Sequence, residues 1–246
     1  MSHALPPIDR DRLPRHIAVI MDGNGRWAER EGVSRAAGHE AGAKSVRAII
    51  EACRELERIE VLSLYAFSTE NWRRSKLEVD ALFRLLSKYI AIELDAIHKE
   101  NIRISIMGRM EGLPARAVRD LQHCIDVTRD NTAMTVNVAI NYGGRAEIAD
   151  AAKRIARDAM AGRIKPEDVD ESRVAQYLYT PQFPDPDLLI RTSGELRLSN
   201  FMLWQLSYAE IVAMPTLWPD FRKPHLYEAI AEYQARQRRF GGRAKK

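Results

Sequence analysis

The stretch HIAVIMDGNGR, residues 16–26, decides the fold. It opens with an apolar run of strand length and closes on an aspartate followed by two glycines, which is typical of a buried strand that turns sharply into a helix. Gly23 and Gly25 let the backbone turn tightly and expose consecutive N–H groups, and such amide donors at a helix start bind phosphate. Arg26 adds a charged donor. The stretch therefore predicts an anion site at the end of the first strand.

Strand patterns and helical patterns alternate outward from this stretch. We expect strands at 16–22, 61–67, 102–108, 134–140 and 188–192, and helices at 38–58, 76–99, 114–130, 144–161 and 224–239. This alternation predicts βαβ units and a parallel sheet covered on both faces. The chain shows no internal repeat, linker or break in composition. It is expected to form a single α/β domain with a central, mostly parallel sheet of about six strands flanked by helices.

Polar residues and glycines follow four of the expected strands, at 22–26, 68–74, 141–145 and 191–195. The carboxyl ends of parallel strands form the ligand-binding edge of an open α/β sheet, so these segments are expected to converge. Asp22 would repel a bare phosphate, but a hard cation between the two removes the conflict. Magnesium is commonly held by one or two carboxylates plus substrate phosphates. The pattern therefore predicts an Mg²⁺-dependent site for a phosphorylated ligand.

Two other interpretations of residues 22–28 stay open on the residues alone. A tight turn with a capping Asp22 or Asn24 needs no ligand. The sequence GNGRWA also fits the G-x-G-x-x-A fingerprint of dinucleotide-binding oxidoreductases. Two residues argue against that fingerprint. Trp27 is bulky where a dinucleotide needs close packing, and Glu60 precedes the second expected strand, whereas the acidic residue that binds the ribose belongs at its end.

Composition and charge narrow the classes of partner and the cellular setting that this chain can have. The formal charge is +4, and the tail from Arg236 to Lys246 holds six basic residues and no acidic one, so the rest is close to neutral and no nucleic-acid partner is expected. The two cysteines, Cys53 and Cys124, form no metal motif, which favours a reduced cytoplasmic setting. No apolar run is long enough to span a bilayer, so any contact with the inner face of the membrane would be peripheral.

Several motifs, in order along the chain, resemble those of the cis-prenyltransferase family. They are HIAVIMDGNGRWA, RAAGH, YAFSTENWRR, NYGGR, LLIRTSGE followed by SNF, WQ followed by YAE, WPDF and RRFGG. Together they cover residues 15–242, which we expect to be the catalytic domain, with 1–14 a flexible segment and 243–246 a basic tail. The bacterial undecaprenyl diphosphate synthase type is the most similar.

The resemblance implies a Rossmann-like but distinct fold, a homodimer and a magnesium cofactor. It also implies condensation of isopentenyl diphosphate onto an allylic prenyl diphosphate, with farnesyl diphosphate as the expected primer. The implied product is a cis-polyprenyl diphosphate that would serve as a lipid-carrier precursor for cell-wall synthesis.

The same resemblance assigns roles to individual residues. Asp22 would bind the metal and act in catalysis, Glu210 would be a second metal carboxylate, and Asn71 would be catalytic in a loop over the site. Substrate binding is implied for Gly23, Asn24, Gly25, Arg26, Trp27, Arg35, His39, Ser68, Thr69, Glu70, Trp72, Arg74, Arg191, Arg197 and Ser199. Arg239 and Gly241 belong to an R-x-G element that would reach a diphosphate across the dimer interface. Ser193 and Leu196 depart from the family pattern, and these departures bear on substrate preference.

The helix expected at 76–99 has more apolar residues than one packed face needs. The surplus is expected to line a product tunnel with residues of the fourth strand; the tunnel residues are Leu82, Leu85, Leu86, Tyr89, Met134 and Val136. A helix buried on two sides would give the same pattern.

Other functions stay open at this point. A shorter- or longer-chain synthase, a non-catalytic subunit of the same fold and an oxidoreductase are the alternatives. A neutral amide such as Asn71 is a poor base, so a diphosphate oxygen is the expected proton acceptor.

Overall fold

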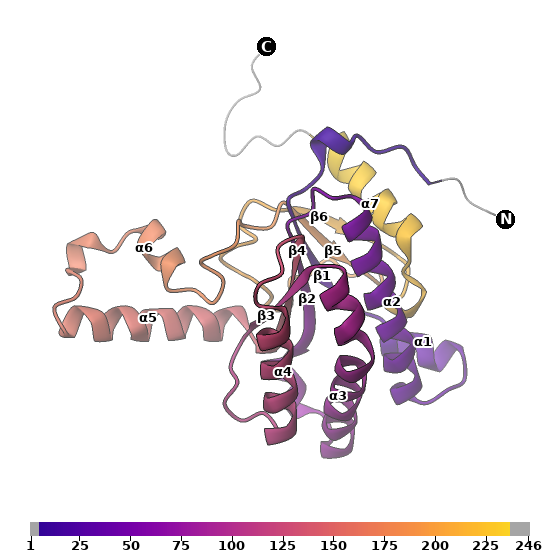
Figure 1. Cartoon of the computed structure of the whole chain (residues 1–246), viewed down its shortest axis with the longest axis horizontal. Helices are drawn as coiled ribbons and strands as arrows, with labels where there is room; N and C mark the ends of the chain where they lie inside the picture. The colour runs from indigo at the N-terminus through magenta and orange to yellow at the C-terminus, as the bar shows by residue number, and fades with distance from the viewer. Residues whose placement is uncertain (1–4, 237–246) are drawn as a thin grey trace, which may run out of the picture.

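The computed structural model describes residues 5–236, which form a six-stranded parallel sheet (Figure 1). The strands are β1 (His16–Ile20), β2 (Val61–Ser68), β3 (Ile102–Met107), β4 (Met134–Tyr142), β5 (Leu188–Arg191) and β6 (Glu210–Ala213), in the order β3-β4-β2-β1-β5-β6. All five neighbouring pairs are parallel. The carboxyl ends of all strands therefore lie along one edge, as the alternating pattern predicted.

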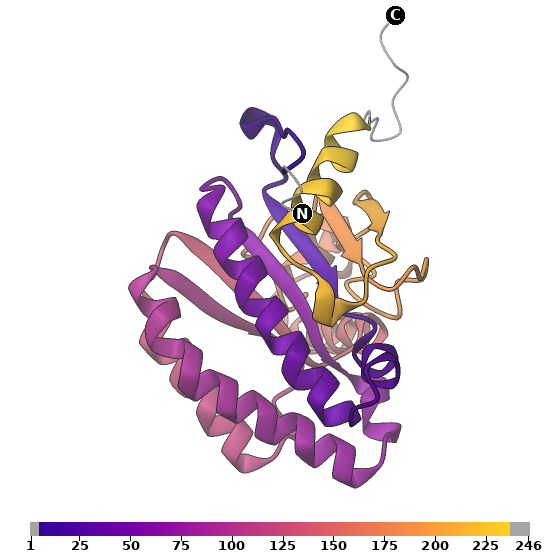
Figure 2. The ribbon, with the colours of Figure 1, turned by 90° about the vertical axis from the view of Figure 1, so that its right-hand side faces the viewer.

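The helices are α1 (Asn24–Arg30), α2 (Arg35–Glu55), α3 (Lys76–Lys99), α4 (Ala115–Thr128), α5 (Gly144–Met160), α6 (Glu171–Gln176) and α7 (Lys223–Ala235). Short 3₁₀ turns lie at Arg10–Arg12, Thr69–Arg73, Pro166–Asp168 and Trp218–Asp220. Figure 2 shows α2 and α3 running side by side across one face of the sheet. In Figure 1, α5 and α6 extend away from the sheet as an arm.

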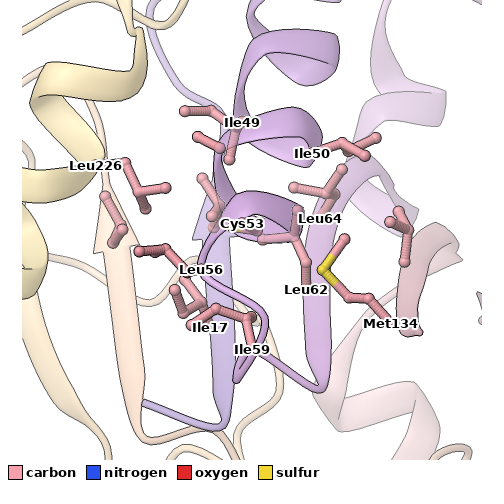
Figure 3. Close-up of a cluster of buried hydrophobic side chains, with 14 of the residues drawn as sticks. Ile17, Ile49, Ile50, Cys53, Leu56, Ile59, Leu62, Leu64, Met134 and Leu226 are labelled. Carbon is pink, nitrogen blue, oxygen red and sulfur yellow. The ribbon is translucent and has the colours of Figure 1, made fainter. Parts of the chain in front are cut away.

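The core follows from the strand pattern. All five residues of β1 are buried, so both faces of the sheet are covered. Ile17 and Val19 face a cluster built with α2, α3, α4 and α7, part of which Figure 3 shows around Ile49 and Leu62. Ala18 and Ile20 face a second cluster that contains Phe201, Met202 and Leu206. Helices thus cover the first face, whereas an irregular segment covers much of the second.

The structure confirms five strands at the expected places and adds one. β6 begins at Glu210, in a segment whose sequence did not predict a strand. α2 starts three residues before the expected helix, at Arg35, because the Ser34 side chain accepts a hydrogen bond from the Ala37 N–H and caps it. No helix among residues 5–236 is both long and apolar enough to cross a membrane.

Candidate active site

The turn after β1 needs only the first of its two glycines: at Gly25, inside α1, an added methyl group would meet nothing within 4 Å, contrary to the expectation from the sequence. Gly23 is the N-cap of α1 and has a φ of 109°, a conformation that residues with side chains rarely adopt. A methyl group added at Gly23 would also lie 2.9 Å from Leu217 Cδ2. Residues 22–26 line a large cavity, so the predicted anion loop faces an open space.

α2 packs closely against this turn through two small residues. A methyl group at Gly38 would lie 2.3 Å from the Asn24 carbonyl oxygen, and one at Gly42 would lie 2.3 Å from Asn24 Oδ1. The close approach carries Arg35 and His39 of α2 into the lining of the same cavity. Burial, followed by the charge of the neighbouring Arg74, lowers the pKa of His39, which favours the neutral imidazole.

Asp22 lies between two arginines at the mouth of the cavity. Arg191 Nη2 donates to Asp22 Oδ2 at 2.9 Å, and Arg26 Nη2 lies 3.3 Å from Asp22 Oδ1. Burial on its own would raise the pKa of Asp22. The hydrogen bond and charge of Arg191 and the charge of Arg26 together outweigh burial, so this pKa is lowered. Asp22 is therefore a carboxylate at neutral pH.

The segment after β5 holds Arg197 of the expected site and contacts Arg26 of α1. Arg26 donates to the carbonyl oxygen and hydroxyl of Ser193 and lies 3.4 Å from Glu195 Oε1. Arg197 donates to the other oxygen of Glu195 at 2.5 Å. Ser193 has a φ of 71°, so a non-glycine residue adopts the left-handed region where it contacts Arg26. A single carboxylate thus holds arginines from both expected diphosphate sites.

A second, smaller cavity of about 500 Å³ adjoins Asp22. Arg191, Ser199 and Asn200 line it. Arg191 is 3% exposed and donates from Nη1 to Ser199 Oγ at 2.8 Å, but its buried Nε has no hydrogen-bond partner. A buried guanidinium N–H without an acceptor is costly, and the charge of Arg191 at the wall of this cavity favours an anionic ligand there.

The segment expected to cover the site forms a short 3₁₀ turn, Thr69–Arg73, at the end of β2. Asn71 Oδ1 accepts a hydrogen bond from the Ser68 N–H at 3.0 Å, so the side chain caps this turn. Asn71 and Arg74 line both cavities, whereas Ser68 and Glu70 line the smaller one. Arg74 also pairs with Glu78 at 3.0 Å.

The larger cavity has a volume of about 1320 Å³ and lies between α2, α3 and the sheet. Its lining runs from Asp22, after the end of β1, to Ile102, at the start of β3. Leu82, Leu85, Leu86, Tyr89 and Val136 line it, as expected for the tunnel. Met134 does not: it is 2% exposed and packs near Leu62 and Leu64, as Figure 3 shows.

The two cavities meet at five shared residues, which are Met21, Asp22, Tyr65, Asn71 and Arg74. One cavity is long and largely apolar along α3, and the other is small and lined mainly by polar side chains. Such a pair can hold an apolar chain with an anionic head next to a second small anion.

Other predicted residues lie away from the cavities. Trp27 Nε1 donates to Asp220 Oδ1 at 2.8 Å, and Trp72 packs its ring against Phe67 and Phe83. Thr69 donates to Glu70 at 3.2 Å. Arg239 and Gly241 lie outside the described residues.

Glu210 does not join Asp22 within the chain. It pairs in register with Leu188, the first residue of β5, whereas Asp22 follows the last residue of β1. Glu210 therefore lies at the amino ends of the parallel strands, and Asp22 lies at their carboxyl ends. Glu210 pairs with Arg236 at 3.0 Å.

The residues around Asp22 fit a magnesium ion that is shared with a substrate. Among residues 5–236, no group of three or more His, Cys, Asp and Glu side chains could hold a metal by itself. Mg²⁺ keeps several waters and is usually bound by one or two carboxylates plus phosphate oxygens. Asp22 supplies a carboxylate, and Arg191, which donates to it and lines the smaller cavity, favours an anion beside it.

Sequence reasoning assigned no role to three side chains at this site. Asn141 has a φ of 50°, and its Oδ1 accepts from Trp72 Nε1 at 2.8 Å, which fixes the ring. Asn200 lines the smaller cavity, and Tyr65 lines both. All three lie in segments that the motifs had marked, but their contacts depend on tertiary structure.

The chain is similar to known enzymes over almost its full length. Residues 20–241 match the family described as "Putative undecaprenyl diphosphate synthase". An isoprenyl transferase of Heliobacterium mobile is 54% identical over 235 residues, covering 96% of this chain and 90% of that protein. One of Bacillus subtilis (strain 168) is 48% identical over 233 residues, covering 95% and 89%.

Two solved structures have the same fold. The crystal structure of lavandulyl diphosphate synthase from Lavandula x intermedia, in complex with dimethylallyl diphosphate, has a TM-score of 0.91 and 37% identity over 93% of this chain and 98% of that one. A probable undecaprenyl diphosphate synthase from Campylobacter jejuni has a TM-score of 0.77 and 36% identity over the same shares. With the family match and the close relatives, this agreement places the chain in the undecaprenyl diphosphate synthase family of prenyltransferases.

Proposed function

We propose that this prenyltransferase condenses isopentenyl diphosphate units onto farnesyl diphosphate with cis stereochemistry and releases a long polyprenyl diphosphate. The observation that carries the proposal is the meeting of a long cavity and a small polar cavity at Asp22. The allylic chain would lie between α2 and α3, and isopentenyl diphosphate would occupy the smaller cavity.

The allylic diphosphate would bind over the turn after β1. Its oxygens would accept from the backbone N–H groups at the start of α1 and from Arg26, Arg35 and His39, which line the cavity mouth. Negative charge grows on the departing diphosphate, so donors fixed before the reaction stabilise the transition state. A magnesium ion bound by Asp22 and this diphosphate would supply further electrostatic stabilisation of the leaving group.

Isopentenyl diphosphate would complete the hydrogen bonds of the smaller cavity. Its oxygens would accept from Arg191 and from Ser199, and Arg197 would turn toward them from Glu195. The double bond would then face the allylic carbon near Asn71. Asn71 already accepts the Ser68 N–H and is neutral, so we assign it an orienting role. A diphosphate oxygen would take the proton lost after the new bond forms.

The growing product would slide along the larger cavity. Burying each CH₂ group is favourable by about 0.8 kcal/mol, so every added unit stabilises the chain deeper in the apolar space. The product would stop growing when this space is full. Shorter and longer products remain the alternatives, and the length is measured directly in the test below.

Two further proposals concern partners. Glu210 could act at the metal of Asp22 only if a second copy of the chain supplied it, which agrees with the homodimer that the family resemblance implies. We also propose that the enzyme works in the cytoplasm and contacts the membrane only peripherally, where the product is released.

The test is turnover with magnesium, farnesyl diphosphate and labelled isopentenyl diphosphate, with products separated by length. We expect a ladder ending in a long polyprenyl diphosphate, no turnover after chelation, and a kcat lower by about 10²–10³-fold for Asp22→Asn, the effect typical of losing one transition-state contact. Full turnover by Asp22→Asn, or turnover in the presence of excess chelator, would contradict the proposal.

A further inference from the structure

The smaller cavity is bounded by a backbone turn in an uncommon conformation. Within residues 5–236, seven non-glycine residues have positive φ, and three of them are Ser199 at 49°, Asn200 at 63° and Met202 at 41°. Left-handed backbone costs a residue with a side chain about 1–3 kcal/mol and persists only where neighbouring contacts enforce it. The turn Ser199–Met202 therefore needs an external support.

This turn carries contacts that shape the smaller cavity. Ser199 Oγ accepts from Arg191 at 2.8 Å. Asn200 Nδ2 donates to Glu70 Oε1 at 2.8 Å, and Asn200 oxygens accept from the Gly144 and Arg145 N–H groups at 2.7 and 2.9 Å. If the turn relaxed, both Ser199 and Asn200 would leave the positions that line the cavity.

A buried pair of side chains holds the far end of the turn. Tyr142, the last residue of β4, accepts the Met202 N–H at 3.1 Å and donates its hydroxyl hydrogen to Glu147 Oε2. Tyr142 and Glu147 are both 0% exposed. Glu147 Oε1 accepts from the Tyr179 N–H at 2.8 Å and from Gln205 Nε2 at 3.0 Å, so the carboxyl group is fixed from two further segments.

Burial raises the pKa of Glu147, and the hydrogen bonds from Tyr142, Tyr179 and Gln205 offset part of that effect. A fully buried carboxyl group that serves only packing could be replaced by an apolar side chain of similar size. Its three hydrogen-bond partners join β4, the segment after α6 and the segment that contains the turn. The contacts thus link these elements around the turn.

We propose that Glu147 and Tyr142 are positioning residues for isopentenyl diphosphate: they hold the strained turn Ser199–Met202 so that the smaller cavity is formed before the substrate binds. Neither residue lines a cavity, so they act through the turn. The inference rests on the proposed function, because it assigns the smaller cavity to isopentenyl diphosphate.

The test uses the full-length enzyme and the variants Tyr142→Phe, Glu147→Gln and the double variant. Removing the Tyr142 hydroxyl leaves the Met202 N–H buried without an acceptor, so we expect the KM for isopentenyl diphosphate to rise about tenfold. The KM for farnesyl diphosphate should change by less than about twofold. Because the two residues act as one unit, the double variant should be no worse than Tyr142→Phe.

Ser63→Ala is the matched control. Ser63 is 0% exposed and accepts from Asn137 at 3.0 Å in a different buried network, so its loss should lower the melting temperature without changing the ratio of the two KM values. If Tyr142→Phe and Glu147→Gln raise the KM values for isopentenyl diphosphate and farnesyl diphosphate in parallel, as a general loss of stability would, the inference is overturned.

Hydrogen exchange gives a second readout that does not depend on turnover. Amides in residues 198–206 should exchange faster in Tyr142→Phe and Glu147→Gln than in the wild type and in Ser63→Ala. Unchanged exchange overturns the inference. If the wild type showed no prenyl transfer, the proposed function would fail, and the exchange data would still decide whether the pair holds the turn.

Discussion

Gly42 shows how one missing side chain positions the anion loop. It lies within α2, where a methyl group would meet Asn24 Oδ1 at 2.3 Å and Trp218 Cδ1 at 2.9 Å. Trp218 Nε1 also donates to the Gly42 carbonyl oxygen at 2.9 Å, so ring and helix are fixed together. Glycine inside a helix costs about 1 kcal/mol relative to alanine, a cost that this close approach explains.

We therefore expect Gly42→Ala to destabilise the protein despite its better helix propensity. Overpacking of this kind typically costs about 1–3 kcal/mol. The shift of Asn24 should also raise the KM for farnesyl diphosphate more than that for isopentenyl diphosphate. Urea unfolding and steady-state kinetics measure the two effects. Lys44→Ala, at an exposed position on the same helix, is the control and should be close to neutral; a Gly42→Ala variant as stable as this control would contradict the account.

Among single residues, the sequence predicted those whose role depends on their immediate neighbours in the chain. Gly23, Gly25 and Arg26 follow a strand directly, so the anion loop could be predicted from adjacent residues. Gly42 has no such signal, because its reason is a contact with Trp218, which lies 176 positions away in the sequence. Met134 was expected in the tunnel, but the side chain faces the core instead.

α3 has apolar residues on more than one face because it closes the large cavity as well as packing on the core. Val79 is buried in a cluster with Phe67, and Leu85 lines the cavity. Phe83 and Leu86 contact both the cluster and the cavity. The sequence left two explanations for this surplus; the structure shows α3 both packed on the core and lining a cavity, and the product tunnel stays a prediction.

A bulky side chain in the cavity should shorten the product. We expect Leu86→Trp to shift the product ladder to shorter chains while the first condensation step proceeds, because only the space for the growing chain is reduced. Leu77→Trp is the matched control: the same substitution, on the same helix, at a position that is 82% exposed. Products of unchanged length from Leu86→Trp, or equal shortening by both variants, would show that chain growth does not follow this cavity.

Strands β1, β2 and β4 share a buried polar chain. His16 Nδ1 lies 2.6 Å from the Pro184 carbonyl oxygen, and Nε2 lies 2.8 Å from Ser63 Oγ. Burial lowers the pKa of His16 to about 4. The folded state therefore holds this imidazole neutral in a range where the unfolded chain, with a pKa near about 6.5, binds a proton.

The free energy of unfolding should decrease as the pH is lowered from about 6.5 to about 4. Since the unfolded state binds more protons between about pH 6.5 and about pH 4, His16 should cost about 2 kcal/mol of unfolding free energy on going from about pH 7 to about pH 5. We expect His16→Gln to be less stable at neutral pH but to lose less stability on acidification. Urea unfolding at both pH values measures the difference. Equal slopes for the two proteins would mean that His16 does not contribute this pH dependence.

At the scale of elements, periodicity predicted five strands because each is longer or more apolar than its surroundings. β6 has only four residues, begins with a charged residue and is preceded by an exposed tyrosine, so no pattern marked it. A sheet covered on both faces was predicted, but the segment that covers the second face was not. Residues 198–206 form it with irregular backbone, which has no sequence period.

At the scale of the whole molecule, one of the two edge strands of the described sheet, β6, has exposed apolar side chains on it and near it in the sequence. β6 pairs only with β5 in the described sheet, and Ile211 on this strand is 39% exposed. Nearby in the sequence, Tyr208 is 68% exposed, and Leu196, in the segment after β5, is 83% exposed. Edge strands are templates for pairing, and exposed apolar groups beside them are typical of an interface.

We therefore expect the proposed homodimer to form across this edge. A charge placed beside this edge would have to be buried in the dimer without a partner, so Tyr208→Arg should convert a dimer of 28.1 kDa chains into monomers, as measured by light scattering after size-exclusion chromatography. Ile92→Arg, on α3 at a position 52% exposed, is the control and should leave the mass unchanged. Because Glu210 and the R-x-G element would act across the interface, the monomer should also lose turnover. A monomeric wild type, or a Tyr208→Arg variant that stays a dimer, would contradict the interface. A fully active Tyr208→Arg monomer would contradict the sharing of residues between copies.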